Sequence, residues 1–304
     1  TYKRYNDIQY LKSIFCANCR PRSTVENEIS DFIKSICSDI DIIKDDRSII
    51  KPLELDIVIP DKKYAIEYNG IFWHSNRYKD KYYHLNKTEL CNKQGYDLIH
   101  ITDSAWIIKQ DIVKDIIKKK MGVIEQRVYG RKCDVRTLTN KETKEFLDTN
   151  HLQGNVSASY NYGLFYNDDL VSVMTFSKSR FNKNIEYELC RFANKLGHVV
   201  IGGFSKLLKH FIKSVSPNSI ISYCDISIFS GNIYKENGFR YINRSAPNYK
   251  YFKNGSLLLE SRNKYQKHKL PQLLENFDPN LTEYQNMQNN NYERIWDCGN
   301  DVYV

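Results

Sequence analysis

The sequence contains no apolar run of about 18 residues, the length that a membrane-spanning helix requires. It does not begin with methionine, and no apolar signal-peptide block follows Thr1. Its 8 cysteines are scattered along 304 residues, which is not the dense pattern of a small disulfide-stabilised domain. We therefore expect no membrane segment, reduced thiols and a cytoplasmic, intracellular location.

The net charge of +9 is distributed unevenly along the chain. Residues 1–122 carry 21 basic and 18 acidic side chains, residues 123–270 carry 23 and 12, and residues 271–304 carry 1 and 6. An AT-rich coding sequence would explain abundant lysine, but it would not confine the basic excess to one segment. A polyanionic partner explains this distribution better, and the length allows two domains with separate cores.

Residues 53–84 bring carboxylates and imidazoles together at a spacing that packing alone does not require. Alternating apolar residues at 53–59, a short turn and a second apolar run at 64–69 predict a hairpin. A symmetric turn places Asp56 directly opposite Glu67 on one face. That pair suits a hard cation such as Mg2+, which binds through one or two carboxylates and substrate phosphate. Two solvated charges on a hairpin face are the alternative.

A glycine and two large aromatic residues precede His74 in the block Gly70–His74. Histidine titrates near neutral pH and therefore suits a general base that deprotonates an attacking water. A histidine that merely packs beside Trp73 is the simpler alternative. However, His84 follows ten residues later and Lys87 lies about one helical turn beyond it. His74 therefore belongs to a group of candidate catalytic residues.

Ser23 and Glu26 form a capping-box signature that predicts a helix over residues 23–36. Glu26 falls on the buried stripe of this helix, whereas Glu28 faces elsewhere and is held in reserve as a candidate. A helix over 79–94 and a strand over 97–102 follow the hairpin, and a helical crossover predicts that this strand runs parallel to its neighbour. His100 in that strand has a structural role in this interpretation, and a helix over 107–120 closes the domain.

Glu26, Asp56, the block IEYNGIFWH and the later GYDLIHI resemble the very-short-patch mismatch-repair endonucleases and related phage homing endonucleases. This EDxHD group is a variant branch of the PD-(D/E)xK nucleases, and the resemblance covers residues 23–120. It implies an α/β domain, a mixed sheet with flanking helices, that cleaves double-stranded DNA with Mg2+ (or Mn2+). By the same resemblance Asp56 binds the metal, His74 is the general base, and Glu26 orients the metal-bound water or the base.

The chain departs from that family at three positions. Asn69 stands where the lysine of E-x-K is expected, His84 falls where relatives carry a second aspartate, and Ile71 replaces a cysteine of the structural zinc site. Cys16 and Cys19 form a single CxxC, which is only half of a zinc site and has no second pair at ribbon spacing. Zinc is therefore not the expected cofactor.

In the mechanism that follows, Asp56 and Glu67 hold the metal, which stabilises charge developing on the scissile phosphate. His74 activates water, while Lys87 or His84 supports the phosphate or the leaving group.

From Val123 onward the pattern changes to a mixed sheet with helices. We expect a helix over 140–150, a hairpin over 160–176, a strand over 186–192, and Gly202-Gly203 leading into an amphipathic helix. The order resembles the GNAT acetyltransferase fold over residues 134–255. A glycine-rich turn at a helix start can hold a pyrophosphate, but the loop Val199–Phe204 lacks the basic or amide residue and the final small residue of the GNAT signature. We expect a GNAT-like α+β scaffold used for DNA contact.

A compact basic cluster suited to phosphates follows. Its members are Arg262, Lys264, Lys267, His268 and Lys269. An ordinary solvated charge run is the alternative. The expected division is thus an arm (1–22), an endonuclease domain (23–122), a basic GNAT-like domain (123–270) and a tail without chemistry (271–304). The other functions considered are a GNAT-type acyltransferase modifying nucleic acid or a nucleobase, and a catalytically inactive DNA-binding protein.

Overall fold

The computed structural model describes residues 22–304, so Cys16 and Cys19 lie outside the described residues. The chain is a mixed α/β protein that divides into two compact units. The first joins the residues up to Ile108 with Ala246–Gly299, and the second joins Lys109–Ser245 with Asn300–Val304. In the described part of the chain, no helix has the length and apolar character needed to cross a membrane.

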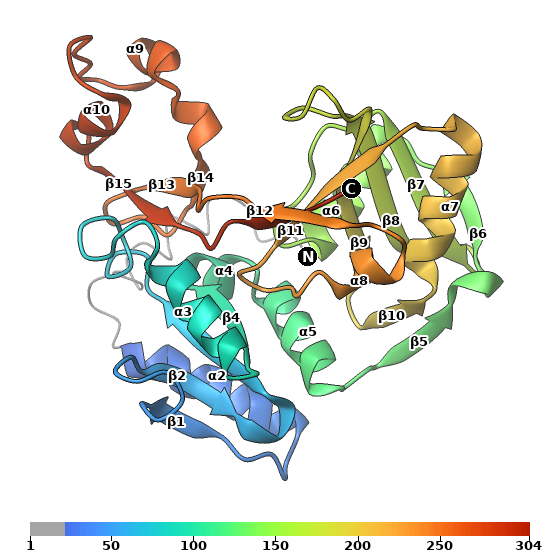
Figure 1. The fold of residues 1–304 in the computed structure, drawn as a ribbon, viewed down its shortest axis with the longest axis horizontal. Helices are drawn as coiled ribbons and strands as arrows, with labels where there is room; N and C mark the ends of the chain where they lie inside the picture. Colours follow the sequence, from blue (N-terminus) through green and yellow to red (C-terminus); the bar gives the residue numbers. More distant parts are fainter. Residues whose placement is uncertain (1–21) are drawn as a thin grey trace. The chain divides into compact units, whose positions relative to one another are not determined.

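The first unit begins with helix α2 (Arg22–Ile36) and contains a four-stranded sheet. Its strands, in spatial order, are β1 (Ile43–Asp46), β2 (Leu55–Ile59), β3 (Tyr64–Asn69) and β4 (Asp97–Thr102). The first three are antiparallel neighbours, whereas β3 and β4 are parallel because helix α3 (Tyr83–Lys93) carries the chain across (Figure 1). The hairpin and the parallel strand are as the sequence predicted. Helix α3 begins at Tyr83, later than expected.

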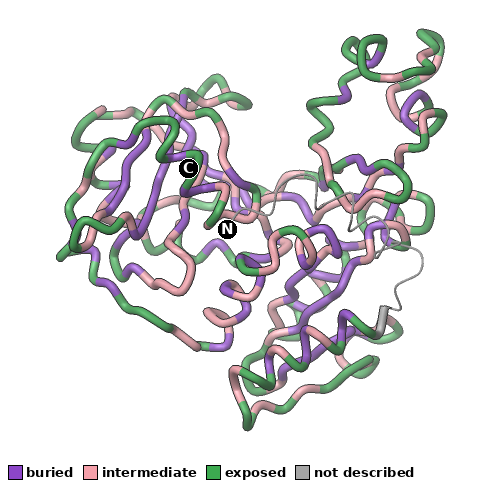
Figure 2. The backbone as a smooth tube through the Cα atoms, turned by 180° about the vertical axis from the view of Figure 1, so that it is seen from behind, coloured by how far each residue is buried: buried purple, intermediate pink, exposed green. Residues whose placement is uncertain are grey.

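Both faces of this sheet are covered, and Figure 2 shows β2, β3 and β4 as buried chain. On one face Val58, Ala65 and Leu98 pack with Cys91 of α3. Helix α2 contacts β2 and β3 and buries the apolar stripe that the sequence predicted, which includes Ile29. Because consecutive strand residues alternate between faces, Glu67 shares the face of Ala65 and points toward α3.

Residues 246–299 complete the first unit. They form a sheet in the order β14 (Glu260–Ser261), β13 (Tyr249–Lys253) and β15 (Tyr292–Trp296). Between β14 and β15 lie η3 (Arg262–Tyr265), η4 (Lys267–Lys269), α9 (Leu270–Leu273) and α10 (Glu283–Asn289). Ile71, after β3, is buried in one cluster with Phe252 and Ile295. The units therefore differ from the expected division at 122 and 270, because this long-range apolar contact returns the chain to the first unit.

The second unit is built on a seven-stranded sheet. Its strands, in spatial order, are β12 (Tyr241–Arg244), β16 (Asn300–Tyr303), β11 (Ile220–Asp225), β9 (Tyr187–Asn194), β8 (Asp169–Lys178), β7 (Tyr160–Tyr166) and β6 (Asp134–Thr137). A short parallel pair joins β5 (Gln126–Tyr129) to β10 (His198–Ile201). Helix α7 (Gly203–Val215) packs Phe211 against Phe176 of the sheet, with ring centroids 3.7 Å apart.

The remaining elements of the second unit are α5 (Gln110–Met121), η2 (Gly130–Lys132), α6 (Asn140–Asn150) and α8 (Asn232–Glu236). Helix α6 opens with a capping box between Thr139 and Glu142. The single helix expected over 107–120 is instead two helices, because α4 (Asp103–Ile108) ends in the first unit and α5 begins the second.

Candidate active site

Helix α3 and the sheet of the first unit enclose a cluster of buried ionisable side chains. Asp56, Glu67, His74, His84 and Lys87 are each no more than 4% exposed. Acidic and basic side chains are almost never fully buried unless they are paired. The structure thus buries all six residues predicted to be catalytic, since Glu26 on α2 is buried as well.

The partner of Glu67 is a lysine on the neighbouring helix. Lys87 Nζ of α3 lies 2.5 Å from Glu67 Oε1, and the two side chains are 3% and 1% exposed. Asn69, which replaces the lysine expected two residues after Glu67, instead lies 3.0 Å from a ring nitrogen of His100. The chain therefore places a lysine beside the β3 carboxylate from α3 rather than from the strand itself.

Asp56 lies at the point where the β2–β3 ladder ends. The last paired residues are Ile57 and Ile66, which matches the predicted register, but the ladder does not extend to Asp56. Asp56 Oδ2 accepts a hydrogen bond of 2.7 Å from the Tyr68 backbone N–H. The expectation that Asp56 is a ladder partner of Glu67 is therefore wrong: its carboxylate replaces a backbone acceptor and bonds to β3 one residue beyond Glu67.

His74 and His84 are joined by a hydrogen bond of 3.0 Å between His74 Nδ1 and His84 Nε2. Burial lowers the pKa of His84 to about 4, although contact with the Trp296 backbone raises it, so this ring is neutral at pH 7. Which ring donates across this pair depends on the tautomers. When His74 donates from Nδ1 to His84 Nε2, the Nε2 of His74 is the basic nitrogen.

His100 has both ring nitrogens engaged inside the same unit. Asn69 Nδ2 donates to Nδ1, so Nε2 carries the proton and donates to Thr88 Oγ1 at 2.8 Å. Thr88 in turn donates to the His84 backbone carbonyl. Burial holds the pKa of His100 well below its usual value. These contacts fit the structural role expected for His100.

Glu26 lies on the buried side of α2, as the helical phase predicted. Glu28 accepts a hydrogen bond of 3.0 Å from the indole of Trp106, which ties α2 to α4. Glu28 therefore has a structural partner of its own.

Asp103 is a buried carboxyl group that sequence reasoning missed. It follows β4 directly and accepts hydrogen bonds from the backbone N–H groups of Ile71 and Ser104. Burial raises its pKa to about 6 in spite of these bonds. Ile71 belongs to the block that contains His74, so Asp103 supports the backbone of the candidate site. Its signal in the sequence is an aspartate immediately after a buried strand.

The metal-binding potential of the cluster rests on Asp56 and Glu67. Within residues 22–304, no group of three or more His, Cys, Asp or Glu side chains is arranged to hold a metal. Mg2+ does not need such a cage, since it commonly uses one or two carboxylates together with substrate phosphate and water. Two carboxylates on adjacent strands are therefore suitable donors in type and number.

The basic cluster predicted at 262–269 lies in the first unit, not with the basic domain to which it was assigned. All five of its residues are exposed. Lys264 pairs with Glu260, while Lys267 and Lys269 donate to the backbone carbonyls of Pro279 and Asn263. By composition the first unit has 23 basic and 22 acidic residues and the second has 22 and 14. The basic excess thus belongs to the second unit.

The start of α7 carries the glycines considered for pyrophosphate binding. Gly202 caps the helix in the left-handed region, with φ 72°. The chain's own η2 lies against this helix start: a Cβ on Gly130 would come within 3.0 Å of the Gly202 carbonyl carbon and the Gly203 nitrogen. One side of the turn is therefore covered by backbone.

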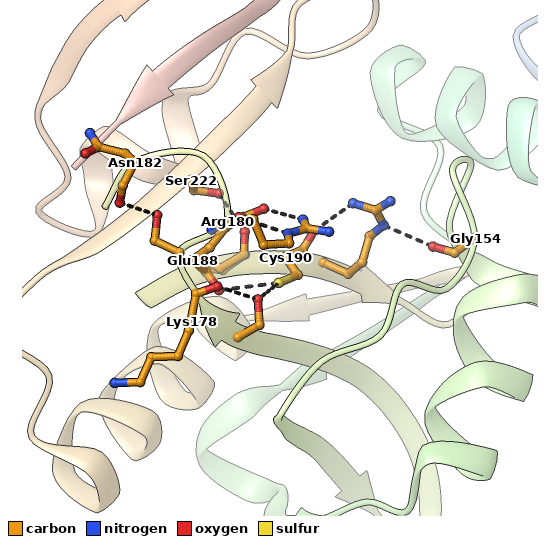
Figure 3. A network of polar contacts seen from close by, with 11 residues as sticks. Gly154, Lys178, Arg180, Asn182, Glu188, Cys190 and Ser222 are labelled. Carbon is orange, nitrogen blue, oxygen red and sulfur yellow. Dashed lines mark hydrogen bonds and ion pairs between the residues drawn. The ribbon is translucent and has the colours of Figure 1, made fainter. Parts of the chain in front are cut away.

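A polar network occupies the region where β9 and β11 diverge (Figure 3). Their parallel pairing ends at Leu189 and Ser222, although both strands continue. Arg180 binds Glu188 through two guanidinium nitrogens. The adjacent Arg191 donates to the backbone carbonyls of Gly154 and Cys190. Burial lowers the pKa of Arg191. The polar groups at this divergence are bonded to each other.

Comparison with known proteins finds no family whose pattern matches the chain and no curated protein that matches it. Among solved structures, the chain is similar to an acetyltransferase from Bacillus subtilis in complex with CoA, with 15% identity and a TM-score of 0.31. The match covers 57% of this chain and 98% of the acetyltransferase.

Proposed function

We propose that this chain is a Mg2+-dependent DNA endonuclease whose hydrolytic site is the buried cluster of the first unit. The observation that carries the proposal is the burial of Asp56, Glu67, Lys87, His74 and His84 together. Replacing buried charged groups by apolar ones is often neutral or stabilising, so stability alone does not explain such a cluster. Burial also lowers the pKa of His84 to about 4, and strongly perturbed ionisable groups are typical of catalytic sites.

Each residue has a role that follows from its contacts. His74 Nε2 takes a proton from the attacking water, and His84 is a positioning residue that holds the His74 tautomer through Nδ1. Asp56 and Glu67 supply the oxygen ligands for Mg2+. Mg2+, when bound, stabilises the charge that develops on the scissile phosphate. Lys87 places a positive charge beside Glu67, where it would support the phosphate or the leaving group.

The finer assignment is a site-specific homing endonuclease of the very-short-patch-repair-like group, acting on double-stranded DNA. The quoted motifs and the mixed sheet with helices support it. A catalytically inactive DNA-binding protein is the simpler alternative, but it has no need of two buried carboxylates beside two hydrogen-bonded histidines.

The second candidate is a GNAT-type acyltransferase, because the helix, hairpin and Gly-Gly elements predicted for the second unit are all present. The backbone contact between Gly130 and the Gly202–Gly203 peptide disfavours a pyrophosphate at this turn. We therefore assign the second unit a DNA-binding role, in keeping with its basic excess.

The test is cleavage of supercoiled plasmid DNA by the full chain with Mg2+ or with EDTA. His74→Ala should lower the cleavage rate about 100-fold or more, since general bases contribute on that order, and should leave DNA binding in EDTA nearly unchanged. Asp56→Asn should abolish Mg2+-dependent cleavage.

Two matched variants control for nonspecific damage. His198→Ala removes a half-buried histidine of the second unit that contacts the Leu196 carbonyl, and Glu28→Gln changes a glutamate of α2 outside the cluster. Both should cleave like the wild type. Wild-type cleavage by His74→Ala would remove His74 from the mechanism, and an intact plasmid with the folded wild type would refute the endonuclease proposal.

A further inference from the structure

Helix α7 carries a row of lysines on the side opposite its apolar face. The buried residues are Phe204, Leu207, Leu208 and Phe211, which pack in the core of the second unit. The row consists of Lys206, Lys209 and Lys213, spaced three and four residues apart, so the three side chains share one stripe. The helix contains no acidic residue.

The turn η2 extends this row with two further cations, Arg131 and Lys132, both exposed. It is attached to α7 by the close approach of Gly130 to the Gly202–Gly203 peptide. Lys206 Nζ also donates to the backbone carbonyl of Cys133, at the end of η2. We call Arg131, Lys132, Lys206, Lys209 and Lys213 the α7 basic face. Its two elements are fixed to each other, so the five charges form one surface.

Several cations elsewhere in the second unit are neutralised by a carboxylate. Lys119, Lys144, Lys178 and Lys195, for example, are each paired with a carboxylate. No ion pair found among residues 22–304 includes a member of the α7 basic face. What sets these five cations apart is that they lie together on two adjoining elements.

We propose that the α7 basic face binds the phosphate backbone of duplex DNA, an inference that rests on DNA as the substrate of the proposed function. Lys206 and Lys213 are separated by about 10 Å along the helix axis, at about 1.5 Å per residue. Successive base pairs advance about 3.4 Å, so the row spans about three phosphates of one strand. Contacts of this kind position DNA without reading its sequence.

The variant that tests this surface is Lys132→Gln/Lys209→Gln/Lys213→Gln in the full chain. It leaves Lys206 in place, because that side chain also fixes η2. The matched control is Lys141→Gln/Lys183→Gln/Lys235→Gln, which removes the same charge from three exposed lysines elsewhere in the second unit.

Binding to a short fluorescent duplex is measured in EDTA between about 50 and 200 mM salt. Each phosphate contact contributes about 0.9 to the slope of log K against log salt, so the test variant should lose about 2 to 3 units of slope while the control keeps nearly the wild-type value. An unchanged slope in the test variant would overturn the proposal, as would an equal loss in the control, which would show an effect of net charge alone. Displacement of the duplex by micromolar CoA would instead assign the surface to a CoA phosphate.

Failure of this inference is distinguishable from failure of the proposed function. If the wild type binds DNA with a steep salt slope but never cleaves it, the endonuclease proposal is refuted and the proposal for the α7 basic face stands. If the wild type cleaves DNA and the test variant binds DNA normally, only the proposal for the α7 basic face is refuted.

Discussion

The buried ion pair between Glu67 and Lys87 predicts a specific pattern of stability losses. Lys87→Met leaves the Glu67 carboxylate buried beside a methionine, and Glu67→Gln leaves the Lys87 ammonium without its anion. With the side chains 1% and 3% exposed, each single change should cost about 3–5 kcal/mol of unfolding free energy. That is a large share of the about 5–15 kcal/mol that stabilises a typical domain. Glu67→Gln/Lys87→Met removes both charges and should recover much of the loss.

Urea unfolding followed by tryptophan fluorescence reports on the first unit, which contains the Glu67–Lys87 pair. Trp73, Trp106 and Trp296 are the 3 tryptophans of the sequence, and all belong to the first unit. The control is Lys264→Met, because the Lys264–Glu260 pair is exposed and should contribute no more than about 1 kcal/mol.

Protonation of the isolated Glu67 would reduce its penalty, so the cost of Lys87→Met should increase with pH. If Lys87→Met costs no more than the control, or if the two single losses simply add in the double variant, the pair does not hold the site together.

Other predictions concern pH and packing. The His84 pKa of about 4, against 6.5 when exposed, means that the contribution of this ring to stability is complete above pH 6.5 and is lost as pH falls toward 4, by about 3 kcal/mol. A urea midpoint that does not change over this range in the wild type would contradict it. The Asp103 pKa is raised to about 6, so its carboxyl favours folding below pH 3.8 and loses this contribution as pH rises through 6. Asp103→Asn, which does not titrate, should therefore show a smaller fall of the urea midpoint between pH 4 and pH 6 than the wild type. Gly130→Ala forces a Cβ to within 3.0 Å of backbone atoms and should lower the stability of the second unit, measured by calorimetry, by about 1–3 kcal/mol. Gly70→Ala should be milder, because the nearest atom to its Cβ is a tryptophan side-chain carbon at 4.0 Å. Equal melting temperatures for the two variants would refute the packing argument.

The hairpin, the parallel strand and the helix starts could be predicted from sequence, because each depends on residues that are close together in the chain. The tight turn before Tyr64 fixed the register of Ile57 with Ile66, and the helical crossover before Asp97 made β4 parallel to β3. The buried stripe of α2 and the Gly202-Gly203 start of α7 followed from periodicity and turn chemistry.

The site was predicted residue by residue, but its contacts were not. Nothing in a sequence period indicates that Lys87 reaches Glu67 across 20 positions, because that pairing depends on how α3 lies over β3. The β2–β3 ladder ends before Asp56, and the Tyr68 N–H donates to the Asp56 carboxylate instead of to a backbone carbonyl. Likewise the contact of Phe252 with Ile71 spans most of the chain, so no local composition shift marks the unit to which residues 246–299 belong.

The central claim is that the first unit hydrolyses phosphodiester bonds with a metal held by Asp56 and Glu67. The most direct measurement is the conversion of supercoiled plasmid by the purified full chain in Mg2+, in EDTA, and as Asp56→Asn in Mg2+. The account predicts nicked or linear DNA in the first reaction alone. An intact plasmid in Mg2+, from a folded wild type that instead releases free CoA thiol from acetyl-CoA, would contradict it and assign the chemistry to the second unit.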